Sequence, residues 1–422
     1  MSTLSPSGRS VQSALLIKGG HDSKGPDSRR FTIIFELAWL SVLLIAQGCV
    51  SLPERNPLPE DKYAESRVLG VSNIRFWSDE AYPGASVFLN ASPDELRSMF
   101  PALAERELHF LAISGGGENG AFGAGLLNGW TASGTRPEFS AVTGISTGAL
   151  IAPFAYLGPA YDHLIEQFYT QYSTEDLVEN RRALQVLKSD AGFGTAPLRA
   201  LIAKFVDETV MEAIAGEYRR GRLLLIGTTN LDAGRPVTWD IGAIADSGKP
   251  GALQLIHDVM LASASIPVAF PPVMIEVEAD GRSYDEMHVD GGVSRQSFLF
   301  SLAASEDTFR RLGAKGKGQA YVIRNAKLDS TWDAVERKIV AIAGRSASSM
   351  VRTQGIGDLY REYLGATKYG FDFNLAYIPS EFDAEAHELF DQEYMQALYR
   401  LGYEMAMNGY PWEDLPPGFE PL

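Results

Sequence analysis

Two stretches decide the fold: LHFLAISGGGENGAFGAGLLNGW at residues 108–130 and SAVTGISTGALIA at residues 140–152. In each stretch a short apolar run, typical of a buried strand, enters a glycine-rich turn and continues into a helical pattern. Parallel strands would bring both turns to the carboxyl edge of one sheet. We therefore predict an α/β fold with three layers, in which helices cover both faces of a mainly parallel central sheet.

The composition excludes several classes of protein. Of the 422 residues, 45% are hydrophobic, which is enough for a packed core and too many for an intrinsically disordered chain. Acidic residues outnumber basic ones by 53 to 37, and this net charge of −16, without a basic run, argues against nucleic acid as a partner. The single cysteine excludes intrachain disulfides and thiolate zinc clusters, and no residue pattern suggests a calcium site or a cofactor.

Residues 1–48 have the pattern of a targeting signal. Arg29 and Arg30 precede an apolar run over residues 31–46, which ends shortly before Cys49. The run is shorter than the roughly 20 residues that span a bilayer comfortably. Its spacing resembles a bacterial lipoprotein signal, which implies that residues 1–48 are removed and that Cys49 carries acyl chains into a membrane leaflet.

Such a lipid anchor implies a membrane-bound protein of the bacterial cell envelope that faces the periplasm. Residues 49–107 are then a linker and N-terminal extension. Two positions depart from the usual signal, because Ala46 and Gln47 stand where Leu and a small residue are common. An ordinary signal peptide of a secreted or periplasmic protein, or a buried helix, is therefore an open alternative. The sequence gives no indication of the oligomeric state.

The first glycine turn also matches a nucleotide-binding pattern. Gly115, Gly117 and Gly120 fit G-x-G-x-x-G, which predicts an acidic residue at the end of the second strand to bind ribose. Glu138 instead precedes that strand, and no Gly-Lys-Ser/Thr follows the turn as in a P-loop. The pattern therefore does not favour a nucleotide site.

The second turn fits G-x-S-x-G, the nucleophile elbow, from Gly144 to Gly148 with Ser146 at its centre. In an elbow the serine is held in a strained strand-to-helix turn, and the glycines leave room for backbone and substrate. The neighbouring glycines at residues 115–117 could aim backbone N–H groups outward, as a developing oxyanion requires. The alternative is that Ser146 only caps the following helix.

A serine hydroxyl needs a base to accept its proton. Asp290 is the best-placed candidate, because it follows a predicted strand at residues 283–289 and begins the tight turn Asp290-Gly291-Gly292. Asp290 could also be an ordinary turn residue. Alternatively, Asp290 and His288 could both be ligands of a metal ion, although the sequence shows no evident third ligand. None of the six histidines lies in a motif that marks a catalytic base. His387 is the one whose place in the chain, after Ser146 and Asp290, would suit a conventional Ser-His-Asp triad.

These motifs, in this order, resemble the patatin-like phospholipase family. A fourth segment, residues 262–272, is similar to the Ala-Ser, Pro and Phe-Pro-Pro run that precedes the aspartate in that family. The joint resemblance extends over roughly residues 108–328, which we take as a patatin-like domain. Residues 329–422 lie outside it and are predicted to be largely helical.

The resemblance implies a serine acyl hydrolase of lipid carboxylic esters, of phospholipase or lysophospholipase type, that forms an acyl-enzyme. Its substrate would be a lipid or phospholipid ester, and no metal or cofactor would be needed. Ser146 matches the nucleophile and Asp290 the base of a Ser-Asp dyad. The matching glycines are Gly115, Gly116 and Gly117 of the oxyanion loop, and the motif glycines Gly120, Gly144, Gly148, Gly291 and Gly292.

One residue departs from the family pattern. Asn119 stands where the family usually has Arg or Lys, which puts in doubt any role of that cation in orienting the loop or a lipid phosphate. A lipid-binding envelope lipoprotein without catalytic activity is therefore a further alternative, beside a conventional Ser-His-Asp esterase.

Replacement of Cys49 tests the predicted anchor. Cys49→Ser removes the sulfur that would be acylated, so we expect the protein to leave the membrane fraction. The measurement is the distribution of full-length wild type and variant between membrane and soluble fractions. Retention of the variant in the membrane would contradict the lipoprotein interpretation.

Overall fold

The structure of the chain is a computed structural model. It describes residues 54–80, 90–180, 190–299, 306–330, 332 and 334–419. The predicted signal and Cys49 lie outside these residues. Residues 52–422 form one compact unit. In the part of the chain that is described, no helix combines the length and the apolar character needed to cross a bilayer.

The two deciding stretches form the predicted strand–turn–helix units. β2 (His109–Ile113) leads through the first glycine turn into α4 (Gly120–Ala132), and β3 (Ala141–Ile145) leads into α5 (Thr147–Leu157). All five residues of β3 are buried, as expected for a parallel strand that is covered on both faces. β2 and β3 pair in parallel, so both glycine turns lie at one edge of the sheet, as predicted.

The central sheet has nine strands within the described residues. Besides β2 and β3 these are β1 (Arg75–Trp77), β6 (Leu223–Asn230), β7 (Arg235–Asp240), β8 (Val273–Ala279), β9 (Arg282–Asp290), β10 (Gly318–Arg324) and β11 (Phe371–Tyr377). Seven strands follow the order β1-β7-β6-β3-β2-β10-β11, and β9 pairs with both β6 and β8. The run β6-β3-β2-β10-β11 is parallel, whereas β1, β7, β8 and β9 join antiparallel, which confirms a mainly parallel sheet.

Ten further α-helices lie within the described residues. They are α3 (Pro93–Met99), α6 (Asp162–Gln171), α7 (Thr174–Leu177), α9 (Ala196–Phe205), α10 (Glu208–Arg219), α11 (Ile241–Asp246), α12 (Ala252–Ser263), α13 (Glu306–Arg311), α14 (Ile339–Tyr369) and α15 (Gln392–Met407). A separate small sheet joins β4 (Glu179–Asn180) to β5 (Phe193–Gly194).

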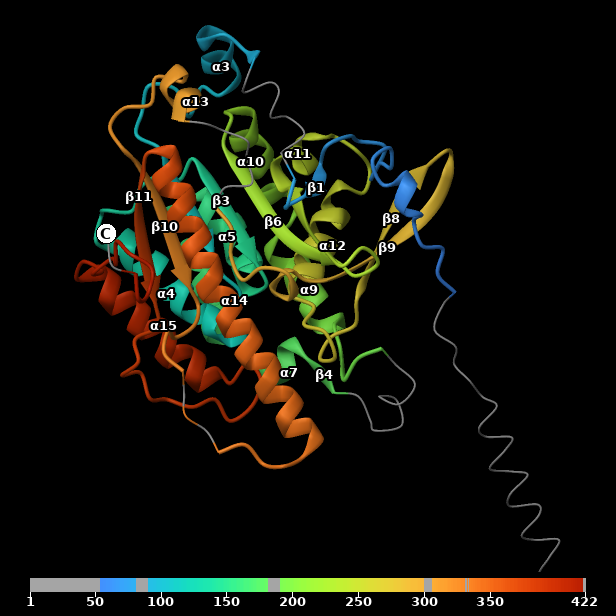
Figure 1. Ribbon diagram of the computed structural model, residues 1–422, viewed down its shortest axis with the longest axis vertical. Coiled ribbons are helices and arrows are strands. Elements are labelled where there is room, and N and C mark those ends of the chain that lie inside the picture. The colour runs from blue at the N-terminus through green and yellow to red at the C-terminus, as the bar shows by residue number, and fades with distance from the viewer. Residues whose placement is uncertain are drawn as a thin grey trace, which may run out of the picture. The chain divides into compact units, whose positions relative to one another are not determined.

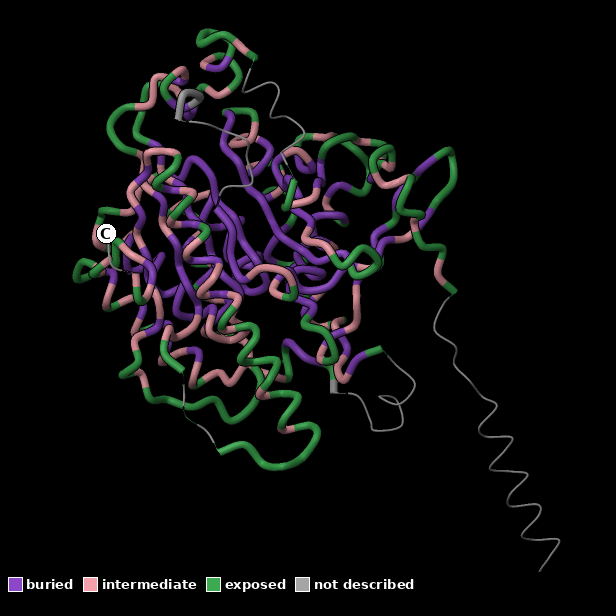
Figure 2. The backbone as a smooth tube through the Cα atoms, viewed as in Figure 1, coloured by how far each residue is buried: buried purple, intermediate pink, exposed green. Residues whose placement is uncertain are grey.

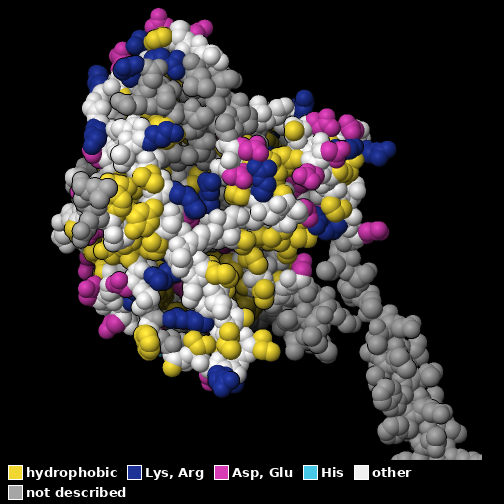
Figure 3. Space-filling view, in the orientation of Figure 1, with side chains coloured by type: hydrophobic (Ala, Val, Ile, Leu, Met, Phe, Trp, Pro, Cys, Tyr) yellow, Lys and Arg dark blue, Asp and Glu magenta, His cyan; other side chains and the backbone are white. Residues whose placement is uncertain are grey.

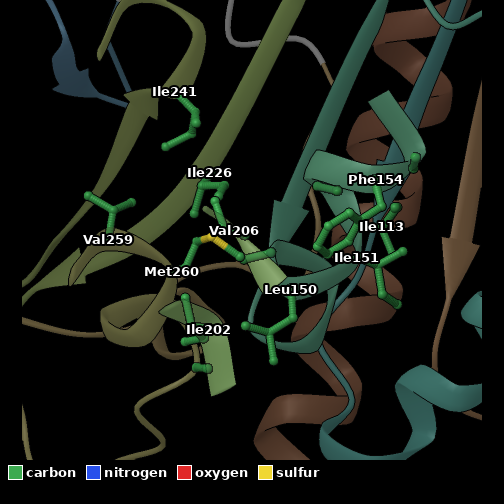
Figure 4. Packing of buried hydrophobic residues seen from close by; sticks show 14 of the residues in the cluster. Ile113, Leu150, Ile151, Phe154, Ile202, Val206, Ile226, Ile241, Val259 and Met260 are labelled. Carbon is green, nitrogen blue, oxygen red and sulfur yellow. The ribbon is translucent and has the colours of Figure 1, made fainter. Parts of the chain in front are cut away.

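Alternate residues of a central strand enter different hydrophobic clusters. On β2, Leu111 and Ile113 join a large cluster with residues of α4, α5 and α12, whereas Phe110 and Ala112 join a smaller one with Leu359 of α14. This is the two-residue period of a strand, so helices enclose the sheet from both faces. Figure 1 shows α14 crossing one face, Figure 2 shows the strands as the buried centre, and Figure 4 shows part of the large cluster. The predicted three layers are confirmed.

Segments outside the predicted patatin-like domain complete the sheet. Residues 329–422 contain the long helices α14 and α15, but they also contribute β11, a strand that the sequence did not predict, which pairs in parallel with β10. In the predicted N-terminal extension, β1 pairs antiparallel with β7. Both ends of the described chain therefore contribute to the same layer as the two glycine turns.

α15 packs very closely against α4. Gly125 and Gly129 of α4 face the backbone carbonyls of Tyr399 and Tyr403, and a Cβ atom at either glycine would overlap the facing oxygen. Gly402 of α15 approaches the backbone of α4 in the same way. The glycines thus allow a helix–helix contact that larger residues would prevent.

A methyl group at Gly125 should disturb this contact. Gly125→Ala overpacks the interface, a change that typically costs about 1–3 kcal/mol of unfolding free energy. Gly344→Ala is the matched control, because Gly344 lies on the exposed first part of α14 with nothing within 4 Å of an added Cβ, and alanine favours a helix by up to about 1 kcal/mol. Urea denaturation measures both. Equal stabilities of the two variants would contradict the close contact.

Candidate active site

Ser146 and Asp290 meet because β3 and β9 share one edge of β6. β3 pairs with β6 up to the partners Ile145 and Gly227. At Thr228, the next residue of β6, the partner becomes Asp290 at the end of β9. Ser146 directly follows Ile145, so the strand register itself brings the two side chains together.

The backbone of Ser146 is strained, as expected for a nucleophile elbow. Its φ of 55° and ψ of −125° lie in a region that non-glycine residues rarely adopt. Its N–H donates to the hydroxyl of Ser263 over 2.9 Å, and that hydroxyl donates to the carbonyl of Gly227 over 2.7 Å. Although Ser146 precedes α5, its side chain makes no capping hydrogen bond. Ser146 does occupy the N-cap position of α5, as the alternative interpretation expects, but its hydroxyl does not bind a helix N–H.

The glycines around Ser146 are required by close backbone contacts. A Cβ at Gly144 would overlap the carbonyl of Gly148, and a Cβ at Gly148 would overlap the carbonyl of Ile113 in β2. Gly120 faces the side chain of Thr147 just as closely. The two glycine-rich turns are thus packed directly against each other.

Asp290 is buried, and hydrogen bonds hold both its backbone and its carboxylate. Its N–H donates to the carbonyl of Ser265 over 2.9 Å, and its carboxylate Oδ1 accepts the N–H of Gly292 over 2.7 Å. Burial raises the pKa of the Asp290 carboxyl from 3.8 to about 6, and hydrogen bonding with the Ser146 side chain and the Gly292 N–H acts in the opposite direction. The carboxyl is thus a stronger base than a solvated aspartate.

The turn after Asp290 also depends on glycine. A Cβ at Gly291 would overlap the carbonyl of Gly227 in β6, and one at Gly292 would crowd the Asp290 carboxylate. Residues 262–272, the segment similar to the Ala-Ser, Pro and Phe-Pro-Pro run, have a structural role. Ser263 accepts the backbone N–H of Ser146, and Ser265 accepts the backbone N–H of Asp290.

The predicted oxyanion loop needs one correction. The N–H of Gly115 donates to the carbonyl of Gln296 over 3.0 Å, so it does not point outward as an oxyanion donor. Gly116 and Gly117 are partly exposed, and Gly117 has a φ of 58° that favours glycine. The candidates for outward N–H groups are therefore Gly116 and Gly117, with Gly115 joining the loop to a neighbouring turn.

Gln296 links the two halves of the site, and no sequence pattern indicated this role. Its carbonyl accepts the N–H of Gly115, and its side chain donates to the carbonyl of Gly292 over 2.7 Å. Its own N–H donates to the buried carboxylate of Asp358 on α14 over 2.7 Å. One residue thus couples the oxyanion loop, the Asp290 turn and α14.

Asn325, after β10, is a second residue that sequence reasoning missed. Its side chain donates to the carbonyl of Ser114 over 3.0 Å and accepts the N–H of Gly123 over 3.1 Å. Its carbonyl would be overlapped by a Cβ at Gly116. Asn325 therefore supports the first glycine turn from behind, through contacts that no local pattern could reveal.

The described histidines form no triad with the serine. The ring of His288 is buried and contacts Thr228 over 2.9 Å and Glu286 over 3.2 Å, and burial lowers the pKa of the His288 ring. His387 is exposed, and its backbone N–H donates to Asp391 over 3.0 Å. Of the five histidines in the described ranges, none forms a hydrogen bond to Ser146 or Asp290. Nor do these ranges contain a group of three His, Cys, Asp or Glu side chains able to hold a metal ion.

Two further predicted positions have structural partners. The side-chain carbonyl of Asn119 accepts the hydroxyl of Tyr394 on α15 over 2.6 Å, which ties the oxyanion loop to that helix.

Glu138 precedes β3, at the end of the strand opposite the glycine turns, and pairs with Arg106 and Arg220. It cannot bind the ribose of a nucleotide at the first turn.

Residues 111–302 match the patatin-like phospholipase family model. The matched residues include both glycine turns, Ser146 and Asp290. No curated protein matches the sequence. Among solved structures, the chain is similar to VipD from Legionella pneumophila, with a TM-score of 0.34 and 12% sequence identity, over 72% of this chain and 66% of that chain. The chain therefore spans about two thirds of the length of VipD.

The buried carboxyl of Asp290 predicts a stability change with a definite sign. The fold favours its neutral form, so wild-type protein loses stability as pH rises from 3.8 through about 6, by about 3 kcal/mol in all. Asp290→Asn lacks this loss. We expect the variant to be more stable than wild type near pH 8 and equal to it near pH 4, as measured by urea denaturation.

Asp240 provides the matched control. Burial raises the pKa of its carboxyl to about 6 as well, but it accepts the N–H of Ala243 at the start of α11. Asp240→Asn should give the same pH-dependent gain in stability. A difference between wild type and Asp290→Asn that does not vary with pH would show that the Asp290 carboxyl is not held in its neutral form by burial.

Proposed function

We propose that the protein is a serine acyl hydrolase that cleaves carboxylic esters of lipids, of phospholipase or lysophospholipase type. Ser146 is the nucleophile and Asp290 the base. The observation that carries the proposal is the meeting of these two side chains at one edge of β6, inside the residues that match the patatin-like phospholipase model.

In the first half of the reaction the Ser146 hydroxyl loses its proton to the Asp290 carboxylate while Oγ bonds to the ester carbonyl carbon. The carbonyl oxygen becomes an oxyanion that the N–H groups of Gly116 and Gly117 would stabilise. Collapse of this intermediate breaks the bond to the alcohol, which leaves with the proton from Asp290. The acyl group then remains on Ser146.

In the second half a water molecule gives its proton to Asp290 and attacks the acyl carbonyl. The second oxyanion collapses, the fatty acid leaves, and Ser146 recovers its proton from Asp290. A transacylase would differ only in using another alcohol in place of water.

The base, the oxyanion donors and the rigid backbone contribute to the proposed reaction in different ways. A carboxyl with a pKa of about 6 remains a weak base for a serine hydroxyl, so proton transfer alone is not sufficient. Each oxyanion donor typically contributes on the order of 10² to 10³ in rate. The strained backbone of Ser146 and the contacts of Gln296 support the proposal, because both hold the reacting groups before substrate binds.

We further propose that the protein is tethered to a membrane of the bacterial envelope through Cys49 and faces the periplasm. Arg55 already contacts the folded unit, since its guanidinium pairs with Asp232 and Asp285, both over 2.7 Å. Six residues reach at most about 20 Å. An acylated Cys49 would therefore hold the hydrolase close to the lipid surface.

Labelling with a fluorophosphonate tests the proposed nucleophile. Wild type should be labelled and Ser146→Ala should not, while Ser133→Ala, a control at the end of α4, should react like wild type. Labelling of wild type should slow as pH falls through about 6, because Asp290 becomes protonated. Asp290→Asn should lower the rate by about 10² to 10⁴.

Two outcomes would favour the alternatives. Loss of labelling in His387→Ala would indicate a conventional triad instead of a dyad. Absence of labelling in folded wild type, together with binding of lipid, would indicate a lipid-binding protein without catalysis. Mass spectrometry of lipids released from membranes by wild type but not by Ser146→Ala would identify the ester.

A further inference from the structure

The first half of α14 exposes a row of large apolar side chains. Ile339 is 88% exposed, Ile342 51% and Met350 67%, and Trp332, shortly before the helix, is 98% exposed. Ile339, Ile342 and Met350 follow each other at helical spacing and therefore lie on one stripe. Soluble proteins rarely leave so many neighbouring apolar side chains in water without a partner.

This stripe leads to the proposed active site. Gln354, one turn after Met350 on the same stripe, donates to the carbonyl of Val293 over 3.4 Å and accepts from Gln296 over 3.3 Å. Val293 belongs to the turn after Asp290, and its side chain is itself 48% exposed. At 1.5 Å per residue, the stripe extends about 22 Å from Gln354 to Ile339.

Exposed apolar residues also border the site on another element. Ile266 and Val268 follow α12, and Val268 is 84% exposed. Val268 has a φ of 73°, a strained conformation for a β-branched residue. The same loop holds Asp290 through the carbonyl of Ser265. Exposed apolar side chains thus lie on three segments that connect to the Ser146–Asp290 region: α14, the Asp290 turn and the loop after α12.

The charge along this part of α14 differs from that of the whole chain. Residues 332–352 carry four basic side chains, Arg337, Lys338, Arg345 and Arg352, against the acidic Asp333 and Glu336, in a protein with a net charge of −16. Arg337 and Lys338 directly precede α14, and Lys338 pairs with Glu336. Figure 3 shows hydrophobic and basic side chains beside one another at the lower edge of the molecule, where Figure 1 places the start of α14. Apolar residues with adjacent basic residues are what an anionic bilayer surface attracts.

We propose that this docking face, formed by the exposed apolar residues of α14 with Trp332, Ile266, Val268 and Val293, inserts into the surface of an anionic lipid bilayer. Docking would bring the Asp290 turn and the loop after α12 close to the membrane, so that a lipid ester reaches Ser146 without crossing water. This inference rests on the proposed lipid substrate, but it concerns a separate surface and does not need the reaction to occur.

A fluorescent probe on the docking face tests the proposal. Full-length protein with Cys49→Ser and Met350→Cys carries one thiol, to which an environment-sensitive dye is attached. We expect its emission to shift to shorter wavelength with vesicles of phosphatidylcholine and phosphatidylglycerol, and less with phosphatidylcholine alone. Met407→Cys, at an equally apolar position that is 45% exposed at the end of α15, is the matched control and should not respond.

Charge reversal tests the contribution of the basic residues. Arg337→Glu combined with Lys338→Glu should weaken vesicle binding about tenfold, since each basic residue near an anionic surface contributes measurably to binding. Hydrolysis of a soluble short-chain ester should not change, because neither residue contacts the site. Unchanged vesicle binding by this variant, or an equal response of the probes at positions 350 and 407, would overturn the proposal.

The docking test does not depend on whether the protein hydrolyses lipid esters. The probe experiment is repeated with Ser146→Ala, which should dock like the parent protein. Docking without Ser146-dependent hydrolysis would contradict the proposed function alone, whereas hydrolysis of lipid without a response at position 350 would contradict the docking face alone. A shifted emission without vesicles, together with a dimeric mass that Ile339→Asp makes monomeric, would assign the face to a second copy of the chain and overturn the proposal.

Discussion

The strand register along β6 is the constraint on which the site depends. β3 ends beside Gly227, and β9 occupies the same edge from Thr228 onward, so the residue after one strand meets the last residue of the other. Gly227 also accepts the hydroxyl of Ser263 and leaves no space for a Cβ at Gly291. A single backbone position thus determines where the serine turn and the aspartate turn can lie. A shift of either strand by one residue would separate the two side chains.

Much of this arrangement could be predicted because it is encoded locally. A strand, a glycine turn and a helix follow one another within a few residues on either side of Ser146, and Asp290 stands at the end of a strand and before two glycines. Each position has a physical requirement that restricts the residue type, such as a positive φ at Gly117 or a close backbone at Gly148. The parallel arrangement of β2 and β3 then follows from the recurrence of the unit.

The remaining features depend on contacts between distant segments. Nothing near Gln296 or Asn325 in the sequence marks them as supports of the glycine loop, because their roles come from folding against Gly115 and Ser114. The same holds for the N–H of Gly115. The local sequence pattern predicts that it stabilises an oxyanion, whereas in the structure it donates to the carbonyl of Gln296. For α14, apolar residues at helical spacing are equally consistent with a buried and an exposed helix, and only its position in the structure distinguishes them.

The strand order also bears on how the protein is made. β2 lies between β3, which is close to it in the chain, and β10, which the ribosome synthesises much later. Until residues 318–324 emerge, a partly synthesised chain has a buried-type hydrophobic strand with one edge open, the kind of edge that pairs with other chains and aggregates. The complete sheet therefore forms only after synthesis has passed β11.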